Sequence, residues 1–119
     1  MKAVLFAFTT EGKKLARKTE EGLKKDKFRG RPINCEITDD SHNVGEMFRS
    51  SDALIFVCAA GIAIRLISPY IEDKLKDPAV IAVDEAGRFV IPLLSGHVGG
   101  ANELSRLIAD RLHAIPVIS

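Results

Sequence analysis

The chain has few cysteines, little net charge and no apolar stretch of membrane-spanning length. Its two cysteines, Cys35 and Cys58, are too few for a disulfide framework, and both lie in apolar, strand-like runs. The N-terminus begins directly with an apolar strand rather than a signal-peptide pattern. These features predict buried free thiols and a reducing, cytoplasmic location. The 17 basic residues nearly balance the 16 acidic ones, so the net charge of +1 excludes a strong overall field for nucleic acid.

The longest apolar run covers residues 53–64 and ends at Arg65. A membrane-spanning helix needs about 20 apolar residues, so this run predicts a buried strand followed by a buried helix. The sequence shows no internal repeat and no low-complexity segment, and 46% of its 119 residues are apolar. We therefore expect residues 1–119 to form one domain whose core needs neither disulfides nor a metal.

Strand-like and helical patterns alternate along the chain. Strands are expected at residues 2–8, 33–38, 52–58, 79–83, 88–93 and 115–118, helices at 13–25, 44–50, 60–70 and 98–113, and a loop at 26–32. Asp84 to Gly87 form a short turn ending in glycine, which predicts a β-hairpin. Thr10 is the expected N-cap of the first helix, and Asn43 or Ser41 that of the second.

This order predicts the α/β class, with a mostly parallel sheet in a three-layer arrangement similar to Rossmann and flavodoxin folds. One antiparallel pair enters the sheet through the hairpin at residues 84–87. Ligands in such folds bind beyond the carboxyl ends of the strands, near a switch in strand order. We therefore expect the functional residues at that edge.

The strongest local motif is S-G-H-V-G-G-A-N-E at residues 95–103, which follows a strand and opens a helix. Its glycines Gly96, Gly99 and Gly100 allow a ligand to approach the backbone. The free N–H groups of a helix start favour an anion or a developing oxyanion. The motif lacks the lysine of a phosphate-binding P-loop and is not a dinucleotide fingerprint. Ligand binding and a tight turn without a ligand stay open as alternatives.

Two titratable residues of this motif are candidates for proton transfer. His97 lies between glycines, and histidine suits acid–base chemistry near neutral pH. The alternative is a solvated or capping histidine. Glu103 could act as an acid or base, or it could simply stabilise the positive end of the helix dipole. A catalytic triad of Ser95, His97 and Asp84 is disfavoured, because the chain has no nucleophile elbow.

Arg65 is the exceptional residue of an otherwise apolar helix. A buried guanidinium needs a carboxylate partner, which could be Asp84, Glu72 or a substrate carboxylate. Gly61 lies at the start of the same helix, and we expect its N-terminus to face one crevice together with that of the helix after Gly100. The three histidines and two cysteines lack the spacing of metal ligands, so no metal site is predicted.

Four blocks of sequence resemble the family of the cobalamin-biosynthesis protein CbiG, in that family's order and spacing. They are G-I-A-I-R at residues 61–65, D-P-A-V at 77–80, V-D-E-A-G-R-F-V at 83–90 and L-S-G-H-V-G-G-A-N-E at 94–103. The resemblance covers about residues 53–119 and matches the N-terminal domain of that family. It implies cobalt-precorrin-5A hydrolase activity in the anaerobic branch of vitamin B12 synthesis. Such an enzyme opens a δ-lactone on a cobalt-bound tetrapyrrole, which then loses acetaldehyde.

The residues themselves suggest how this chemistry could be performed. His97 and Glu103 are the candidate catalytic residues, and the backbone around Gly96 could hold the oxyanion. The candidate substrate-binding residues are Gly61, Arg65, Ser95, Gly96, Gly99, Gly100 and Asn102. No cofactor is expected, because the resemblance implies that the substrate carries its own cobalt.

The expected partners follow from the same resemblance. Family members continue into a C-terminal domain, so the chain is expected to be either a fragment or a product whose partner is encoded separately. A homodimer is left open, and no nucleic acid or membrane partner is expected. The alternative function is a non-catalytic tetrapyrrole-binding or assembly module that needs a C-terminal partner. A generic nucleotide- or flavin-binding domain is disfavoured, because no acidic residue follows a first glycine-rich turn at a suitable distance.

Overall fold

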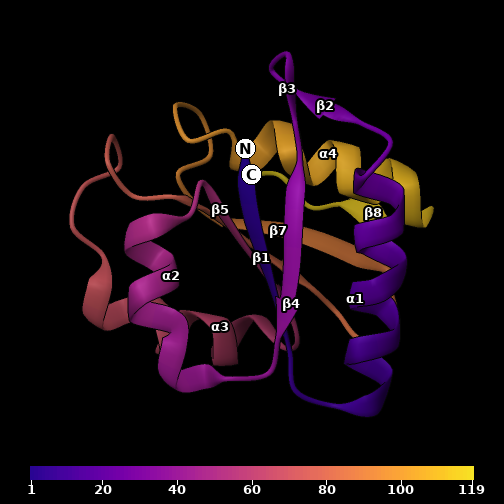
Figure 1. Cartoon of the computed structure of the whole chain (residues 1–119), viewed down its shortest axis with the longest axis horizontal. Coiled ribbons are helices and arrows are strands. Elements are labelled where there is room, and N and C mark those ends of the chain that lie inside the picture. The colour runs from indigo at the N-terminus through magenta and orange to yellow at the C-terminus, as the bar shows by residue number, and fades with distance from the viewer.

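A computed structural model describes all residues, 1–119, and confirms the predicted alternation of strands and helices (Figure 1). The main elements are β1 (Lys2–Ala7), α1 (Thr10–Leu23), β4 (Asn34–Thr38), α2 (Val44–Ser50), β5 (Ala53–Val57), α3 (Ala60–Ile67), β6 (Ala79–Val83), β7 (Phe89–Leu94), α4 (Ala101–Leu112) and β8 (Ile115–Pro116). Short 3-10 helices occur at Ser41–Asn43 and Ser68–Tyr70. A small hairpin of β2 (Lys27–Phe28) and β3 (Arg31–Pro32) occupies the segment expected to be a loop.

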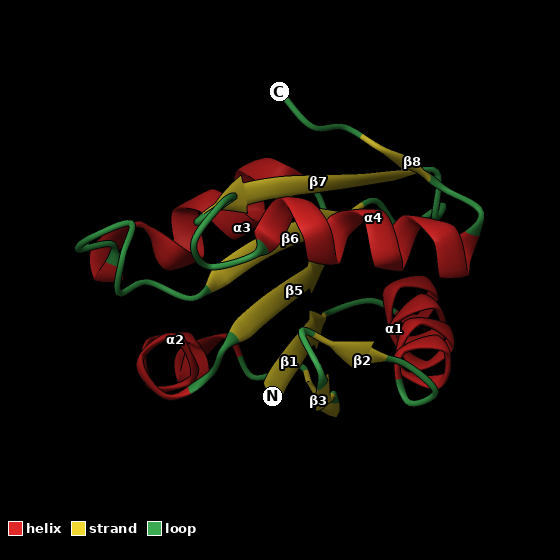
Figure 2. Ribbon diagram, turned by 90° about the horizontal axis from the view of Figure 1, so that it is seen from above, coloured by secondary structure: helices red, strands yellow, loops and turns green.

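The six strands of the main sheet follow the order β4-β1-β5-β6-β7-β8. Neighbouring strands are parallel except for β6 and β7, which pair antiparallel through the predicted hairpin at Asp84 to Gly87. Asp84 closes that turn, because its carboxylate accepts the N–H groups of Arg88 and Phe89 at 2.8 and 2.7 Å. Helices α1 and α4 cover one face and α2 and α3 the other, which confirms the three-layer α/β class (Figure 2).

Two apolar clusters, one on each face of the sheet, form the core. Alternate residues of the central strands point to opposite faces, as a pleated strand requires. Leu5 and Ile55 pack against α1 and α4. The rings of Phe6 and Phe56 stack on the side of α2 and α3, with 4.8 Å between their centroids. Strand β5 is buried along its whole length, so the long apolar run of the sequence begins as an interior strand. No helix of the chain combines the length and apolarity that crossing a bilayer would require.

Several element boundaries differ from those expected, each for a local reason. The N-cap of α1 is Thr9 rather than Thr10, and its hydroxyl accepts the N–H of Gly12 at 2.9 Å. Asn43 precedes α2 without a side-chain cap, and Asp40 caps the preceding 3-10 turn instead. Helix α4 begins at Ala101 rather than residue 98, because Gly100 has φ +86° and cannot continue the helix toward its N-terminus.

Helix α3 is not the buried helix that its apolar sequence suggests. Only Ala63 and Ile67 are buried, while Ile62 and Ile64 are each about half exposed (48% and 49%). Arg65 is also exposed and takes part in no ion pair. The expectation of a buried guanidinium held by Asp84 or Glu72 is therefore wrong. A single helix on one face of a sheet buries only one stripe, whatever the residues on its outer side.

Candidate active site

The glycine loop, residues 95–100, connects β7 to α4 at the edge where the parallel strands begin. Leu94 pairs with Val80 near the start of β6, and the hydroxyl of Ser95 donates to the carbonyl oxygen of Asp77 at 3.1 Å. The loop therefore does not lie at the carboxyl edge of the parallel strands, where we expected the functional residues. Strand β7 runs antiparallel to β6, so the loop that follows it leaves from the edge at which β6 and the strands parallel to it begin (Figure 2).

Gly61 and Arg65 lie at the other end of the sheet. Helix α3 begins after the carboxyl end of β5, whose last residue Val57 pairs with the last residue of β6, Val83. The N-termini of α3 and α4 consequently do not face one crevice. Gly61 has no atom within 4 Å of the position a Cβ would take. The structure thus separates Gly61 and Arg65 from the other candidate substrate-binding residues.

Close packing explains the three glycines of the glycine loop. A Cβ at Gly96 would lie 2.8 Å from the side-chain oxygen of Asn102, and one at Gly99 would lie 2.5 Å from the Cβ of Ser95. A Cβ at Gly100 would lie 2.7 Å from the ring of Phe28. These distances are shorter than real Cβ contacts, so a side chain at any of the three positions would force a neighbouring group to shift.

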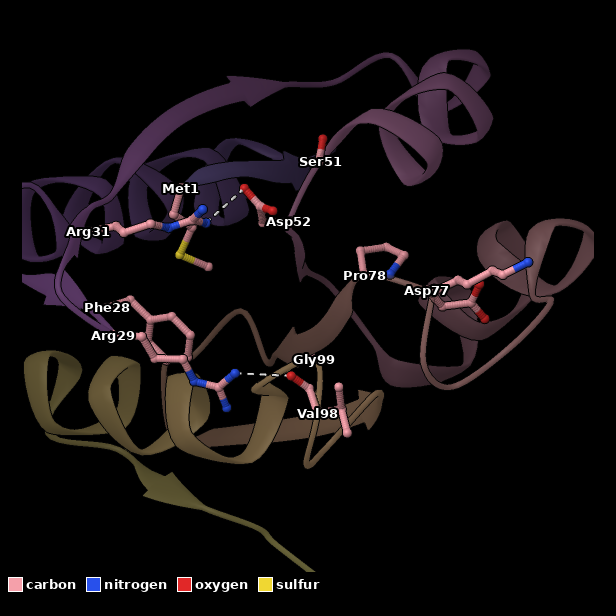
Figure 3. Close-up of a pocket in the computed structure, with 11 residues that line it drawn as sticks. Met1, Phe28, Arg29, Arg31, Ser51, Asp52, Asp77, Pro78, Val98 and Gly99 are labelled. Atoms are coloured by element: carbon pink, nitrogen blue, oxygen red, sulfur yellow. Dashed lines mark hydrogen bonds and ion pairs between the residues drawn. The ribbon is translucent and has the colours of Figure 1, made fainter.

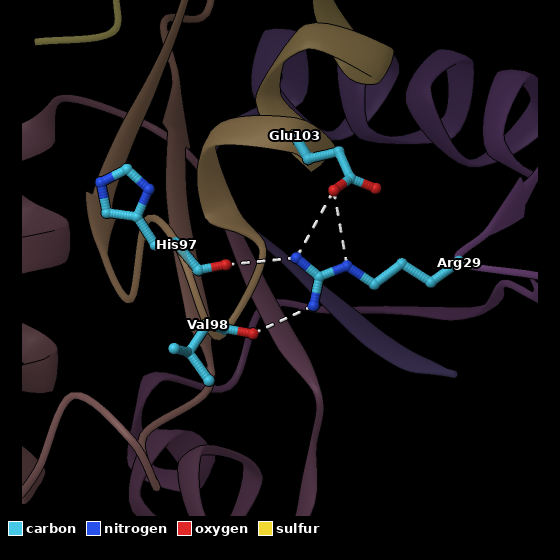
Figure 4. Close-up of polar contacts among 4 residues, drawn as sticks. All are labelled: Arg29, His97, Val98 and Glu103. Carbon is cyan, nitrogen blue, oxygen red and sulfur yellow. Dashed lines mark hydrogen bonds and ion pairs between the residues drawn. The ribbon is translucent and has the colours of Figure 1, made fainter.

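The β2–β3 hairpin holds the outer side of the glycine loop through Arg29 (Figure 4). Its guanidinium donates to the carbonyl oxygens of Val98 and His97 at 3.0 and 3.2 Å, and it contacts the carboxylate of Glu103 at 3.4 Å. The same guanidinium lies over the ring of Phe28, 5.1 Å from its centroid. Sequence reasoning missed this clamp, because a contact between residues 29 and 103 crosses 74 positions and leaves no local pattern.

His97 and Glu103 are not brought together as an acid–base pair. Figure 4 shows the imidazole of His97 pointing away from Arg29 and Glu103. The carboxylate of Glu103 forms an ion pair with Arg29. His97 is exposed and lines a cavity of about 290 Å³ together with Ser95, Gly96 and Asn102. Among the candidates, His97 is therefore the titratable side chain that faces this cavity, and Glu103 helps to position the loop.

The loop also presents unused hydrogen-bond donors. The N–H groups of residues 96–99 have no acceptor in the protein, whereas those of Ala101 and Asn102 donate back to Ser95 and Gly96 at 3.1 and 3.0 Å. Free backbone amides beside an imidazole are the parts that acyl hydrolysis requires, because they can stabilise a tetrahedral oxyanion. The Ser95 hydroxyl is buried and already donates to Asp77, and Asp84 lies at the other edge of the sheet. The serine triad is therefore not formed.

Neither cysteine offers a reactive thiolate or a metal ligand. Burial, with a smaller contribution from the nearby carboxylates of Glu20 and Glu85, raises the pKa values of Cys35 and Cys58 to about 11. Both thiols therefore stay protonated at neutral pH. The chain contains no group of three or more histidine, cysteine or acidic residues placed to hold a metal ion.

Removing the clamp should loosen the glycine loop. Replacing Arg29 by glutamine deletes the contacts to Val98, His97 and Glu103, so we expect about 1 kcal/mol lower unfolding free energy. We also expect amide exchange about fivefold faster at residues 100–102, measured by hydrogen exchange.

The matched control is Arg106→Gln, which removes an exposed arginine of α4 that has no ion-pair partner. Equal exchange at residues 100–102 in the wild-type protein and the Arg29 variant would contradict the clamp.

The fold and the glycine loop define the class of this protein. It is an α/β domain that presents a histidine and free amides at a glycine-rich strand-to-helix turn. The family model described as "Cobalamin synthesis G N-terminal" matches residues 42–119, and the chain belongs to this family. The resemblance seen in the sequence is thereby confirmed.

Curated relatives and a solved structure agree with this assignment. A cobalt-precorrin-5A hydrolase of Salmonella typhimurium is 53% identical over 74 residues, which cover 62% of this chain and 21% of the relative. One of Priestia megaterium is 48% identical over 73 residues, or 61% of this chain and 20% of the relative. A crystal structure of a cobalamin biosynthesis protein G homologue from Sulfolobus solfataricus superposes with a TM-score of 0.81 at 28% identity, covering 99% of this chain and 36% of that one. The matched region spans about a fifth of the curated relatives.

Proposed function

We propose that this chain provides the N-terminal part of a cobalt-precorrin-5A hydrolase. In this role it opens the δ-lactone of a cobalt-corrinoid intermediate, from which acetaldehyde is then lost. The observation that carries the proposal is the glycine loop, in which Gly96 and His97 line one cavity and their backbone N–H groups have no acceptor in the protein. Curated relatives at 42–53% identity bear the name of this hydrolase, although they are much longer than the matched region.

The proposed chemistry assigns a role to each part of the loop. His97 takes a proton from the attacking water, and the amides of Gly96 and His97 stabilise the oxyanion formed at the lactone carbonyl. Breaking the lactone C–O bond leaves a carboxylate and a hydroxyl group. Deprotonation of that hydroxyl then allows the adjacent C–C bond to break, so that acetaldehyde leaves and the bonding electron pair passes to the macrocycle. The cobalt belongs to the substrate, and the proposal requires no other cofactor.

The second candidate is a non-catalytic module that binds the tetrapyrrole or assembles with a C-terminal partner. The observation that favours it is the length of the relatives, of which the matched region is about a fifth. Glu103 points in the same direction, because its contact with Arg29 removes one of the two expected acid–base groups from the cavity. We also propose a cytoplasmic location for the chain in either role, and a homodimer stays a prediction.

The two candidates are separated by one anaerobic experiment. Cobalt-precorrin-5A is incubated with the chain alone and with the chain plus the segment of a relative that follows the matched region. We expect acetaldehyde release in the second mixture, measured with an aldehyde-trapping reagent. Substrate binding without release in both mixtures would favour the non-catalytic module, and absence of both binding and release would contradict the two candidates together.

A further inference from the structure

A polar cavity of about 330 Å³ lies on the outer side of the glycine loop, at the edge where the parallel strands begin (Figure 3). The β2–β3 hairpin contributes Arg31, the start of β5 is preceded by Asp52, and the connector before β6 contributes Lys76. Val98 and Gly99 of the glycine loop complete the wall. The cavity therefore shares one loop with the candidate active site but is lined by different side chains.

Of the cations that line this cavity, Arg29 is engaged by the glycine loop, whereas Arg31 and Lys76 share only one exposed ion pair between them. The Arg31 side chain is 61% exposed, lies 3.5 Å from Asp52 and donates no hydrogen bond within the protein. Asp52 in turn accepts the backbone N–H of Lys2 at 2.8 Å. Lys76 takes part in no ion pair. A guanidinium with free donors and a lysine with free charge are therefore available to a ligand.

Asp77, the acidic residue of the connector that lines this cavity, forms no ion pair with these cations. Asp77 is 8% exposed, and its carboxylate accepts the backbone N–H groups of Glu72 and Asp73 at 3.0 and 3.2 Å. It thereby shapes the connector that carries Lys76. A neighbouring cavity of about 210 Å³ shares Lys76, Asp77 and Pro78 and adds Arg49 and Glu72, neither of which forms an ion pair.

Arg31, Lys76 and Arg49 thus line two cavities that share Lys76, on a chain whose net charge is only +1. Cavities of about 300 Å³ are at the small end of ligand pockets. The two cavities suit carboxylate arms rather than a whole macrocycle, which would lie across the openings. Val98, 61% exposed, offers apolar surface at that rim.

We infer that the two cavities joined at Lys76 bind peripheral carboxylates of a tetrapyrrole, with Arg31 as a bidentate donor and Lys76 as the shared cation. The inference rests on the proposed function for the identity of the macrocycle, and it holds for binding whether or not the chain is catalytic. It assigns substrate recognition to residues at the same sheet edge as His97. It also replaces Arg65, which lies at the opposite edge, as the arginine that meets the anionic substrate.

Equilibrium binding of porphyrin polycarboxylates, followed by their fluorescence at low ionic strength, tests this site. The probes are uroporphyrin, with acetate and propionate arms on every pyrrole ring, and coproporphyrin, which lacks the acetates. We expect tighter binding of uroporphyrin and loss of affinity as salt is added. Arg31→Gln and Lys76→Gln should each weaken binding about fivefold, because each removes a charge-assisted contact. Their thermal stability should stay close to that of the wild-type protein, since the only ion pair involved is exposed.

Lys18→Gln is the matched control, because it removes an exposed lysine of α1 that has no ion-pair partner and lines neither cavity. If the Arg31 and Lys76 variants bind uroporphyrin as the Lys18 variant does, or if the wild-type protein binds neither porphyrin, the inference is overturned. If the wild-type protein failed these binding tests but still released acetaldehyde, the proposed hydrolase function would stand while the carboxylate site would not. Conversely, binding that depends on Lys76 without any acetaldehyde release would support this site and count against the hydrolase.

Discussion

Replacing His97 by alanine is expected to lower acetaldehyde release by roughly 100-fold or more, because positioned acid–base groups contribute about 10²–10⁴ to rate. His97 lines the cavity together with Gly96, the N–H groups of both residues have no acceptor, and Glu103 does not line that cavity. The measurement is single-turnover release of acetaldehyde from cobalt-precorrin-5A. The assay contains the chain together with the segment of a relative that follows the matched region. The melting temperature should stay unchanged, since His97 is exposed.

Two further variants make this result specific. His42→Ala removes a histidine whose side chain is 98% exposed and should leave the rate unchanged. Glu103→Gln should lower the rate less than tenfold, because Glu103 acts through Arg29 and the loop. Full activity of the His97 variant would refute the assigned role. A loss in the Glu103 variant as large as that in the His97 variant would identify Glu103 as an acid–base group instead.

Much of the fold follows from patterns that are local in the sequence. The run at residues 53–57 is apolar at every position, which predicts a strand covered on both faces, and β5 is buried throughout. The turn from Asp84 to Gly87 predicts a hairpin, and Asp84 closes it with two backbone hydrogen bonds. The β2–β3 hairpin escaped prediction because each strand has only two residues, too few for a periodic pattern.

The sequence indicated which residues of the glycine loop lie together, but not at which edge of the sheet they lie. The glycines, His97 and Asn102 do meet at one turn, as their spacing suggests. The predicted hairpin already implied that β7 runs antiparallel, so the loop after it had to leave from the amino edge of the parallel strands. General experience with parallel sheets pointed to the other edge and led to the wrong expectation that α3 and α4 share a crevice. The Arg29 clamp depends on contacts between distant segments that no local rule encodes.

Burial was overestimated where apolar content was high. Helix α3 is apolar at nearly every position, yet only Ala63 and Ile67 are buried, with Leu66 partly buried beside them. Arg65 therefore needs no buried partner and remains in solvent. The cations with a structural context for binding an anion, Arg31 and Lys76, lie in segments that look like unremarkable charged loops in the sequence.

Replacing Gly100 by alanine is expected to lower the unfolding free energy by about 2–4 kcal/mol. Gly100 has φ +86°, a conformation that costs a residue with a side chain about 1–3 kcal/mol. The new methyl group would also lie 2.7 Å from the ring of Phe28 and 3.2 Å from a guanidinium nitrogen of Arg29, so the hairpin must shift. Urea denaturation followed by circular dichroism measures the change. The same shift should release the Arg29 clamp and speed amide exchange at residues 100–102.

Two further substitutions, at Gly61 and at Phe28, separate the cost of the positive φ at Gly100 from the cost of the contact with the Phe28 ring. Gly61→Ala places a methyl group in open space within α3, so it should be neutral or stabilise the protein by up to about 1 kcal/mol. Combining Gly100→Ala with Phe28→Leu removes the close ring contact but keeps the positive φ. The coupling between these two substitutions, measured as a double-mutant cycle, should therefore be about 1 kcal/mol, with the remaining loss due to the backbone. If Gly100→Ala were no more destabilising than Gly61→Ala, the hairpin would not be packed on the glycine loop, and Arg29 could not position His97.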